Sequence, residues 1–378
     1  MIGITRSPRR PGFAAGTLWP VSLRDVDAVV LVGGKGTRLR PLTLSTAKPM
    51  LPTAGVPMLA HLLSRIQAVG IRHVVLGTSY LAETFANHFG DGSEFGLDLE
   101  YVVETEPLGT GGGIRNVAPY LRGSEVMVFN SDVLAGTDLS AVMATHRETE
   151  ADVTLHLVRV PDPRAFGCVP TDADGRVQAF LEKTDDPPTD QINAGCYVFR
   201  REIIDTIPEG RPVSVERETF PGLLAVGSRV SGHVDATYWR DLGTPLDLVD
   251  GSADLVRGLA PSNALPGPNG EALVLKGADV APDAVLLGGS TVGAGAVVGA
   301  GARLDGALLF DGAVVGEGAV VQRSVLGAGA RVDAGATVTG VVIGDRAVVG
   351  EGCELRDGVR VWPDVVLPPG GVRFSAGV

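Results

Sequence analysis

The pattern of apolar and polar residues in this 378-residue chain changes between residues 256 and 272. In the first part, runs of Val, Leu and Ile alternate with segments whose apolar residues recur at helical spacing. We expect buried strands at 27–32, 71–76, 97–103, 125–129, 151–160, 177–181 and 192–199, and one that ends at 235–241. We expect helices at 57–69, 112–121 and 245–256, and another that follows an N-cap at Ser214. This order predicts a parallel α/β sheet with the carboxyl ends of all its strands along one edge.

The second part repeats one aliphatic residue every six positions, beginning with Val274, Val280 and Leu286. The register slips by one after Leu304, and the aliphatic residues at 292, 309, 326 and 343 are then 17 apart, about one three-sided coil each. Gly, Ala or Asp usually follows the aliphatic residue. Small residues with one stacked aliphatic per face are typical of the hexapeptide repeat of a parallel β-helix.

These patterns divide the chain into four predicted parts. Residues 25–256 form the α/β domain, 257–272 form a linker rich in Pro and Gly, and 273–378 form the β-helix domain. Residues 1–24 contain several arginines and prolines but no apolar stretch of the length that a secretory signal needs. We therefore expect them to be a disordered extension.

Charge, apolar runs and cysteine spacing exclude several classes of function. The net charge of −12 argues against nucleic acid as a main partner, and no apolar run is long enough to cross a membrane. Three cysteines lie far apart without a C-x-x-C pair, which fits a protein of the reducing cytoplasm. The chain has only four lysines, at positions 35, 48, 183 and 276. Since arginine is preferred elsewhere, Lys48 and Lys183 are candidates for gripping a single phosphate.

The first predicted strand ends in the glycine-rich turn Gly33-Gly34-Lys35-Gly36. Such a turn exposes successive backbone N–H groups, which form a nest suited to phosphate. Arg38, Arg40 and Lys48 follow closely and add positive charge. The turn matches neither the Walker A loop nor the Rossmann fingerprint. It nevertheless points to a nucleoside triphosphate as the ligand.

Carboxylates follow other predicted strands. Asp132 and Asp241 each lie at a strand end and could hold Mg²⁺ on a triphosphate, although capping a turn is the commoner role of such residues. Glu104 could accept the adjacent N–H groups of guanine, with Gly109 leaving room for the base, or could simply be solvated. Lys183 beside Glu182 is either a phosphate ligand or an exposed ion pair. The six histidines show no metal-ligand spacing, and we expect structural or surface roles for them.

Taken in order, the motifs resemble the sugar-1-phosphate nucleotidyltransferases, and within that family the mannose-1-phosphate guanylyltransferase branch. The matching strings are GGKGTRLRPLT, AKPMLP, ETEPLGTGG, NSDVL, FLEK, INAGCYVF, SVERETFP and WRDLGTP, together with the hexapeptide repeat. The resemblance implies a Rossmann-like catalytic domain and a left-handed β-helix. It covers nearly the whole chain, but residues 1–24 have no counterpart and Lys35 stands at a variable position.

The resemblance also implies a role for each candidate residue. Mannose 1-phosphate attacks the α-phosphorus of GTP, which gives GDP-mannose and pyrophosphate with Mg²⁺ as cofactor. The residues implied in catalysis are Arg38, Lys48, Asp132, Lys183 and Asp241, with Asp132 and Asp241 also holding the metal. Those implied in nucleotide binding are Leu31, Gly33, Gly34, Gly36, Thr37, Glu104, Gly109 and Thr110. Those implied in sugar binding are Gly167, Glu182 and Asn193.

Three alternatives remain open at this point. The same chemistry could use glucose or heptose 1-phosphate, or another nucleotide. A regulatory, non-catalytic paralogue would be expected to lack Arg38, Asp132, Lys183 or Asp241, and all four are present. A β-helix acyltransferase would use a histidine in or beside its coils, and no histidine follows His233. We therefore expect the coils to serve assembly, in a homo-oligomer, or regulation.

Overall fold

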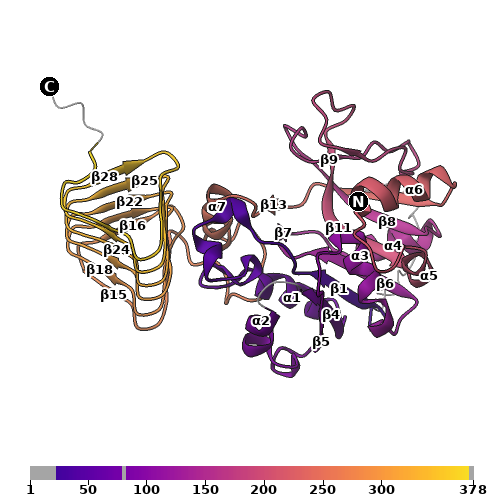
Figure 1. Cartoon of the computed structure of the whole chain (residues 1–378), viewed down its shortest axis with the longest axis horizontal. Coiled ribbons are helices and arrows are strands. Elements are labelled where there is room, and N and C mark those ends of the chain that lie inside the picture. Colours follow the sequence, from indigo (N-terminus) through magenta and orange to yellow (C-terminus); the bar gives the residue numbers. More distant parts are fainter. Residues whose placement is uncertain (1–22, 79–81, 374–378) are drawn as a thin grey trace, which may run out of the picture.

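The computed structural model describes residues 23–78 and 82–373. The predicted extension at 1–24 thus lies almost entirely outside the described residues. The rest forms an α/β domain with a stack of flat coils beside it (Figure 1). The two parts differ in architecture as the change of sequence rhythm predicts.

One mixed sheet organises the α/β domain. Its main strands, in order across the sheet, are β12 (Val230–Asp235), β8 (Val153–Arg159), β11 (Gln191–Arg200), β6 (Glu125–Asn130), β1 (Asp27–Leu31), β4 (His73–Thr78) and β5 (Asp98–Val103). The short strands β9 (Gly167–Cys168) and β10 (Leu181–Glu182) continue from the start of β11. They form an arm that projects from the sheet (Figure 1).

The prediction of a wholly parallel sheet is wrong at β11, which runs antiparallel to both β6 and β8. The start of β11 therefore lies at the same edge as the carboxyl ends of β1 and β6. The strand expected at 177–181 is wrong over most of its length, since only Leu181 belongs to a strand, β10. Val177 makes an isolated bridge with Thr171 across the turn at Asp172 and Gly175.

Helices cover both faces of the sheet. They are α1 (Met58–Ala68), α2 (Ala82–Phe89), α3 (Gly109–Asn116), α4 (Leu139–Glu148), α5 (Arg201–Asp205) and α6 (Phe220–Ala225). Helix α7 (Pro245–Arg257) packs in a separate cluster with the coils. Ala28 and Val30 of β1 pack in the core with α1, α2 and α4, whereas Val29 packs in the core with α3, α5 and α6. Both faces of β1 are thus buried, as its unbroken apolar run predicts. Ser214 is the predicted N-cap and accepts from the backbone N–H of Arg217.

The coils form three parallel sheets. The first contains β14 (Ala272–Val274), β17 (Ser290–Val292), β20 (Leu308–Leu309), β23 (Val325–Leu326), β26 (Val342–Ile343) and β29 (Arg360–Val361). The second contains β15 (Asp279–Val280), β18 (Val297–Val298), β21 (Val314–Val315), β24 (Arg331–Val332), β27 (Val348–Val349) and β30 (Val366–Leu367). The third contains β16 (Val285–Leu287), β19 (Arg303–Asp305), β22 (Val320–Gln322), β25 (Thr337–Thr339) and β28 (Glu354–Arg356).

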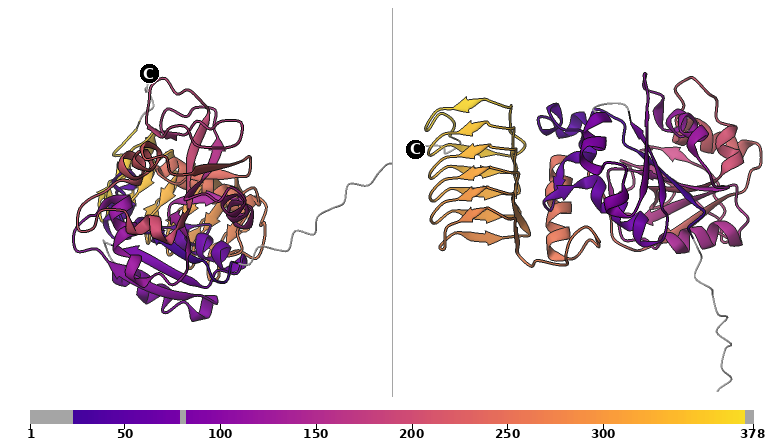
Figure 2. Two further views of the ribbon diagram at one scale, coloured as in Figure 1. Left: turned by 90° about the vertical axis from the view of Figure 1, so that its right-hand side faces the viewer. Right: turned by 90° about the horizontal axis from the view of Figure 1, so that it is seen from below.

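The six-residue repeat predicts the stacking of these coils correctly. Val292 pairs with Leu309, Leu309 with Leu326, and Leu326 with Ile343, and all four side chains are buried in one core. Val274 is 46% exposed although it pairs with Val292, because it belongs to the first coil of the stack. Figure 2 shows the coils edge-on as parallel layers. The domain is a parallel β-helix, consistent with the left-handed hexapeptide type.

The β-helix packs directly on the α/β domain. One apolar cluster joins residues of both, including Leu39 and Leu42 from the first domain and Leu308 and Phe310 from the coils. Helix α7 lies between the central sheet and the coils (Figure 1) and contacts β17. Within the described residues, no helix has the length and apolar character needed to span a membrane.

Candidate active site

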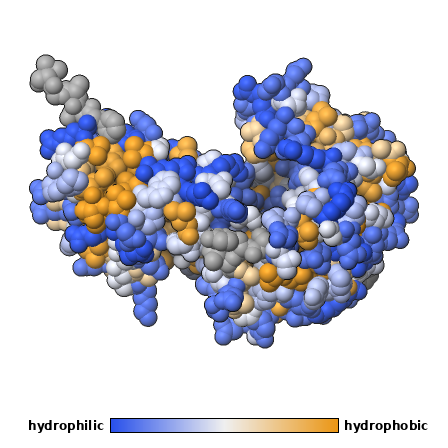
Figure 3. Space-filling model, in the orientation of Figure 1, coloured by the Kyte–Doolittle hydropathy of each residue, from blue (hydrophilic) through white to orange (hydrophobic). Residues whose placement is uncertain are grey.

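Asp132 and Asp241 lie next to each other at the ligand edge of the sheet. Asp132 connects β6 to the short strand β7 (Val133–Ala135), which pairs antiparallel with β13 (Trp239–Asp241). In this pair Asp241 is opposite Val133, and the N–H of Leu242 donates to the carbonyl oxygen of Asp132 over 2.8 Å. The sequence prediction that the two strand ends meet is therefore correct. Figure 3 shows a hollow in this domain's surface beside the arm that carries β9.

The two carboxylates have different surroundings. The ammonium nitrogen of Lys48 lies 2.5 Å from Oδ2 of Asp132. Burial, and after it the negative charge of Asp132, raise the pKa of Asp241 to about 6, although Lys48 and Arg38 oppose the shift. The buried Oδ1 atom of Asp241 has no hydrogen-bond partner among the described residues. A buried carboxylate oxygen without a donor, next to a second carboxylate, is a site that suits a cation.

The glycine-rich turn has the backbone that the sequence predicts. Gly34 has φ +105° and Gly36 has φ +55°, values that favour glycine. Gly36 begins the single 3₁₀ turn at Thr37–Leu39, and its carbonyl accepts from the Thr43 hydroxyl over 2.8 Å. A Cβ atom on Gly36 would lie 3.2 Å from Cβ of Lys48. The absence of a side chain thus lets the Lys48 segment come close to the turn.

Arg38 reaches the same site across Gly243. A Cβ atom on Gly243 would lie 2.6 Å from a terminal nitrogen of the Arg38 guanidinium. Thr244, the next residue, caps α7 in a capping box with Asp247. Each part of the motif Asp241-Leu242-Gly243-Thr244 therefore has a role. Asp241 supplies a carboxylate, Gly243 leaves space for the Arg38 guanidinium, and Thr244 begins helix α7. Gly243 was not among the predicted site residues.

Glu104 follows β5 and is held against the start of α3. Its Oε2 atom accepts from the N–H of Leu108 over 3.3 Å, and burial raises the pKa of this carboxyl. A Cβ atom on Gly113 would lie 2.7 Å from Oε1. Glu104 is thus half-buried in a close-fitting backbone environment rather than fully solvated.

We expected glycine at position 109 to leave room for a base, but the structure gives a different reason for glycine there. Gly109 has φ +69°, and a Cβ atom would lie 2.7 Å from the carbonyl oxygen of Val213. The space is taken by the chain itself. Thr110 accepts from the N–H of Val215 over 2.9 Å and donates to Glu216 over 2.8 Å, so its hydroxyl ties α3 to the helix that follows Ser214.

The predicted sugar-binding residues gather around the arm. Glu182 of β10 pairs with Gly167 of β9, and a Cβ atom on Gly167 would lie 2.8 Å from the ring of Phe180. Lys183 has the unusual φ of +45°, is 64% exposed, and lies 4.0 Å from Glu182. Asn193, at the start of β11, donates to the hydroxyl of Tyr197 over 2.7 Å. The antiparallel direction of β11 is what brings Asn193 to this edge.

Trp239 joins the arm to the carboxylate strands. Its indole N–H donates to the carbonyl of Ala194 over 3.0 Å, and its ring meets Phe166 edge to face at 5.4 Å between centroids. Phe166 directly precedes Gly167. Trp239 was not among the predicted site residues. Its position two residues before Asp241 could have indicated that it lies near the site.

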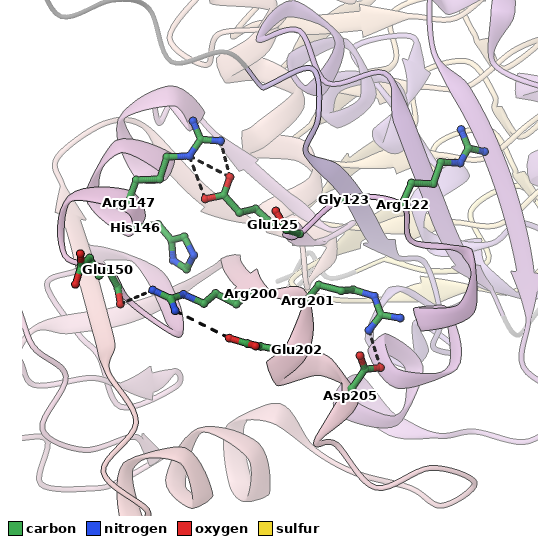
Figure 4. Close-up of a pocket in the computed structure, with 11 residues that line it drawn as sticks. Arg122, Gly123, Glu125, His146, Arg147, Glu150, Arg200, Arg201, Glu202 and Asp205 are labelled. Carbon is green, nitrogen blue, oxygen red and sulfur yellow. Dashed lines mark hydrogen bonds and ion pairs between the residues drawn. The ribbon is translucent and has the colours of Figure 1, made fainter.

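A second cavity, of about 840 Å³, lies at the opposite end of the sheet, where β6 begins and β11 ends (Figure 4). Its arginines already pair with carboxylates, for example Arg147 with Glu125 and Arg201 with Asp205. Burial lowers the pKa of His146, which also lines it, to about 4. This cavity holds no strand-end carboxylate pair and no glycine-rich turn, so it is not the candidate active site.

Family models and relatives agree with this site. A model described as "Nucleotidyl transferase" matches residues 27–258, and one described as "GMPPB C-terminal domain" matches residues 269–376. The mannose-1-phosphate guanylyltransferase of Mycobacterium tuberculosis is 64% identical over 95% of this chain and 100% of its own length. The chain belongs to the mannose-1-phosphate guanylyltransferase family. The resemblance carried by the sequence motifs is thereby confirmed.

Other relatives and a solved structure are more distant. Mannose-1-phosphate guanylyltransferase 1 of Arabidopsis thaliana is 34% identical over 71% of this chain and 78% of its own length. Among solved structures, HddC from Yersinia pseudotuberculosis complexed with GMP-PN is 28% identical, with a TM-score of 0.53 over 60% of this chain and 97% of that one. The chain is therefore an enzyme of the nucleotidyltransferase class, which disfavours the regulatory and acyltransferase alternatives.

Proposed function

We propose that this chain transfers the guanylyl group of GTP to mannose 1-phosphate, giving GDP-mannose and pyrophosphate. The observation that carries the proposal is the carboxylate pair Asp132 and Asp241 beside a glycine-rich turn with Lys48 and Arg38. The 64% identity to a mannose-1-phosphate guanylyltransferase supports the choice of substrates. An attacking phosphate oxygen is already anionic, so the reaction needs no general base.

We propose Asp132 and Asp241 as the protein ligands of a divalent metal, and Mg²⁺ as that metal. The unpartnered Oδ1 atom of Asp241 fits such a hard cation, which prefers oxygen ligands. Among the residues that the structure describes, no cluster of three or more His, Cys, Asp or Glu forms a closed cage. Two carboxylates with open positions suit Mg²⁺ that also binds phosphate and water. When bound, the ion would neutralise charge on the phosphates of the nucleotide.

The triphosphate is assigned to the turn at residues 33–37. Gly33, Gly34, Gly36 and Thr37 would offer backbone N–H groups to the β- and γ-phosphates. Arg38 and Lys48 would neutralise the departing pyrophosphate. Lys48 now pairs with Asp132, so phosphate binding would exchange one anionic partner of the lysine for another. Catalysis of this type consists mainly of positioning and charge neutralisation.

The base and the sugar are assigned to opposite ends of the sheet edge. Leu31, Glu104, Gly109 and Thr110 lie at or near β1, β5 and α3 and are proposed to bind guanine, with Glu104 as the acceptor. Thr110 and Gly109 would act through their backbone, since the Thr110 hydroxyl is already engaged. Gly167, Glu182 and Asn193 are proposed to contact mannose, and Lys183 its phosphate.

Domain roles follow from the same assignment. We propose residues 25–256 as the catalytic domain, 257–272 as the linker and 273–378 as the β-helix domain. The enzyme is proposed to act in the cytoplasm, without nucleic acid or membrane as partner. We also propose a homo-oligomer that uses the β-helix. The outward positions of its second sheet are largely apolar, at Val297, Val314, Val348 and Val366, and Figure 3 shows apolar residues gathered on the coiled domain.

Pyrophosphate release with Mg²⁺ tests the substrates. GTP, ATP, UTP and dTTP are each combined with the 1-phosphates of mannose, glucose and galactose. We expect strong turnover only for GTP with mannose 1-phosphate. Strong turnover with another nucleotide would discard the role of Glu104, and turnover with another sugar would discard the sugar assignment. An inactive grid would reject the proposal.

A further inference from the structure

The β-helix touches the segment that links Arg38 to Lys48. Arg360 of β29 donates from Nη1 to the carbonyl oxygen of Arg40 over 2.7 Å. The hydroxyl of Ser45 donates to Oδ2 of Asp345 in the coils, also over 2.7 Å. Two polar contacts from the second domain therefore hold this segment, one at the backbone of Arg40 and one at the side chain of Ser45. The same segment carries the positive charges that we assign to the triphosphate.

The same segment has an apolar backing that includes the coils. Leu39 and Leu42 are 0% and 2% exposed and belong to one cluster with Phe310, Val325 and Val342. Leu39 follows Arg38 directly. Burial of Leu39 in this cluster therefore helps to fix the backbone next to Arg38.

The coils also brace the second carboxylate strand. Arg323 lies 3.1 Å from Asp250 of α7, and Asp250 lies 3.6 Å from Arg240, the residue before Asp241. Arg240 is held further by Asp254 at 3.2 Å. This chain of ion pairs runs from the β-helix through α7 to the metal-ligand strand β13.

The interface is thinly built at this point. A cavity of about 410 Å³ lies between the start of α7 and the coils, and both Arg323 and Arg360 line it. The effect of removing one of these arginines should therefore be measurable rather than absorbed by neighbouring contacts.

We propose that Arg360 is a positioning residue for nucleotide binding, through which the β-helix holds the 37–48 segment in its binding geometry. The guanidinium fixes the carbonyl of Arg40, two residues after Arg38. It does not touch the substrate. The β-helix is then part of the nucleotide site's support and not only a surface for assembly. This inference rests on the proposed function, because it assigns the 37–48 segment to GTP.

Arg360→Ala tests the proposal, with Arg331→Ala as the matched control. Arg331 is also an exposed arginine of the coils, but it pairs with Asp333, and within the described residues it makes no hydrogen bond or ion pair with the 37–48 segment. We expect Arg360→Ala to raise the KM for GTP about three- to tenfold, the range for loss of one partly exposed hydrogen bond. The KM for mannose 1-phosphate should not change. Arg360→Lys, which keeps a charged donor, should fall between the two.

Hydrogen exchange of the nucleotide-free protein provides a readout that does not depend on the substrate. The N–H groups of Leu39, Arg40 and Leu44 donate to the nearby carbonyl oxygens of Gly36, Thr37 and Pro41. Their exchange should be faster in Arg360→Ala than in the wild type and unchanged in Arg331→Ala. If the wild type fails to use GTP, the proposed function falls, while this measurement still decides whether Arg360 holds the segment.

Several results would overturn the inference. These are an unchanged KM for GTP together with unchanged exchange, an equal rise of KM for both substrates, or the same changes in Arg331→Ala. If Arg360→Ala does not fold, Ser45→Ala is judged by the same criteria, since it removes the hydrogen bond from Ser45 of the 37–48 segment to Asp345 of the coils and lies outside the proposed catalytic groups.

Discussion

Lys48 and Asp132 form an ion pair with 2.5 Å between Nζ and Oδ2, and it joins the segment after the glycine-rich turn to the end of β6. Asp241 lies next to this pair, half-buried, and its buried Oδ1 atom has no hydrogen-bond partner in the described part of the chain. The positive charge of Lys48 thus offsets the repulsion between the carboxylates of Asp132 and Asp241. A cation that binds both carboxylates competes with Lys48 for Asp132.

Lys48→Met should make the protein more dependent on metal. Without the ammonium, the two carboxylates repel each other, and we expect a loss of about 1–3 kcal/mol in stability without Mg²⁺. Because the metal no longer competes with a lysine, Mg²⁺ should raise the Tm of this variant more than that of the wild type. Thermal unfolding with and without Mg²⁺ measures both effects, with Lys276→Met as the control. Equal Mg²⁺ shifts in variant and wild type would contradict the competition.

Lys183→Ala should weaken mannose 1-phosphate binding selectively. The left-handed backbone at Lys183 aims an exposed ammonium from the arm, and we assign it to the sugar phosphate. We expect the KM for mannose 1-phosphate to rise tenfold or more, roughly the value of a charged hydrogen bond, with a much smaller change for GTP. Steady-state kinetics with each substrate varied in turn measures this. Equal effects on both KM values would reject the assigned role.

Gly243→Ala should displace Arg38 without unfolding the protein. The new methyl group would meet the end of a flexible side chain, which can move away. Arg38 would then no longer lie beside Asp241, and we expect kcat/KM for GTP to fall about tenfold or more. The matched control is Gly222→Ala, since nothing lies within 4 Å of a Cβ atom there. A Tm drop in Gly243→Ala without loss of activity would show that the glycine serves only packing.

His61 should make the fold sensitive to acid. Burial lowers its pKa from 6.5 to about 4, while its ring nitrogens lie 2.9 Å from the Thr53 carbonyl oxygen and 2.7 Å from the Ser262 hydroxyl. Between these pH values the unfolded chain binds the proton and the folded chain does not, so stability falls as pH drops from 6.5 towards 4. Above pH 6.5, the neutral state of His61 contributes about 3 kcal/mol to the free energy of unfolding.

Denaturant unfolding at several pH values measures this loss. His61→Asn removes the titrating group and should flatten the decline in stability. His88→Asn is the control, because that histidine is exposed. If His61→Asn declined as steeply as the wild type, other groups would account for the acid sensitivity.

The parts of the site that sequence could predict are those with a local signal. Asp132 follows the apolar strand β6, and the carboxyl ends of β1 and β6 meet at one edge of the sheet. Asp241 was also expected at a strand end, although the structure brings it to Asp132 by antiparallel pairing of β13 with β7. The 17-residue spacing of Val292, Leu309 and Leu326 gave the coil register, because each aliphatic residue must stack on the next. The unusual strings around these residues identified the family.

The parts that could not be predicted depend on contacts between distant segments. An apolar run does not reveal the direction of a strand, so the antiparallel course of β11 was missed. The need for glycine at position 109 comes from Val213, which lies in another loop. The contact of Leu39 and Leu42 with the coils could not be predicted either, because the sequence around them does not show which distant residues they meet.

Formation of GDP-mannose by the wild type and by Asp132→Asn tests the central claim most directly. The purified protein is treated with a chelator, given GTP and mannose 1-phosphate, and then supplied with Mg²⁺, while GDP-mannose and pyrophosphate are measured together. We predict no product before Mg²⁺ is added and equal amounts of both products afterwards. Asp132→Asn should keep its fold but stay inactive. Product without metal, or wild-type activity in Asp132→Asn, would contradict the account.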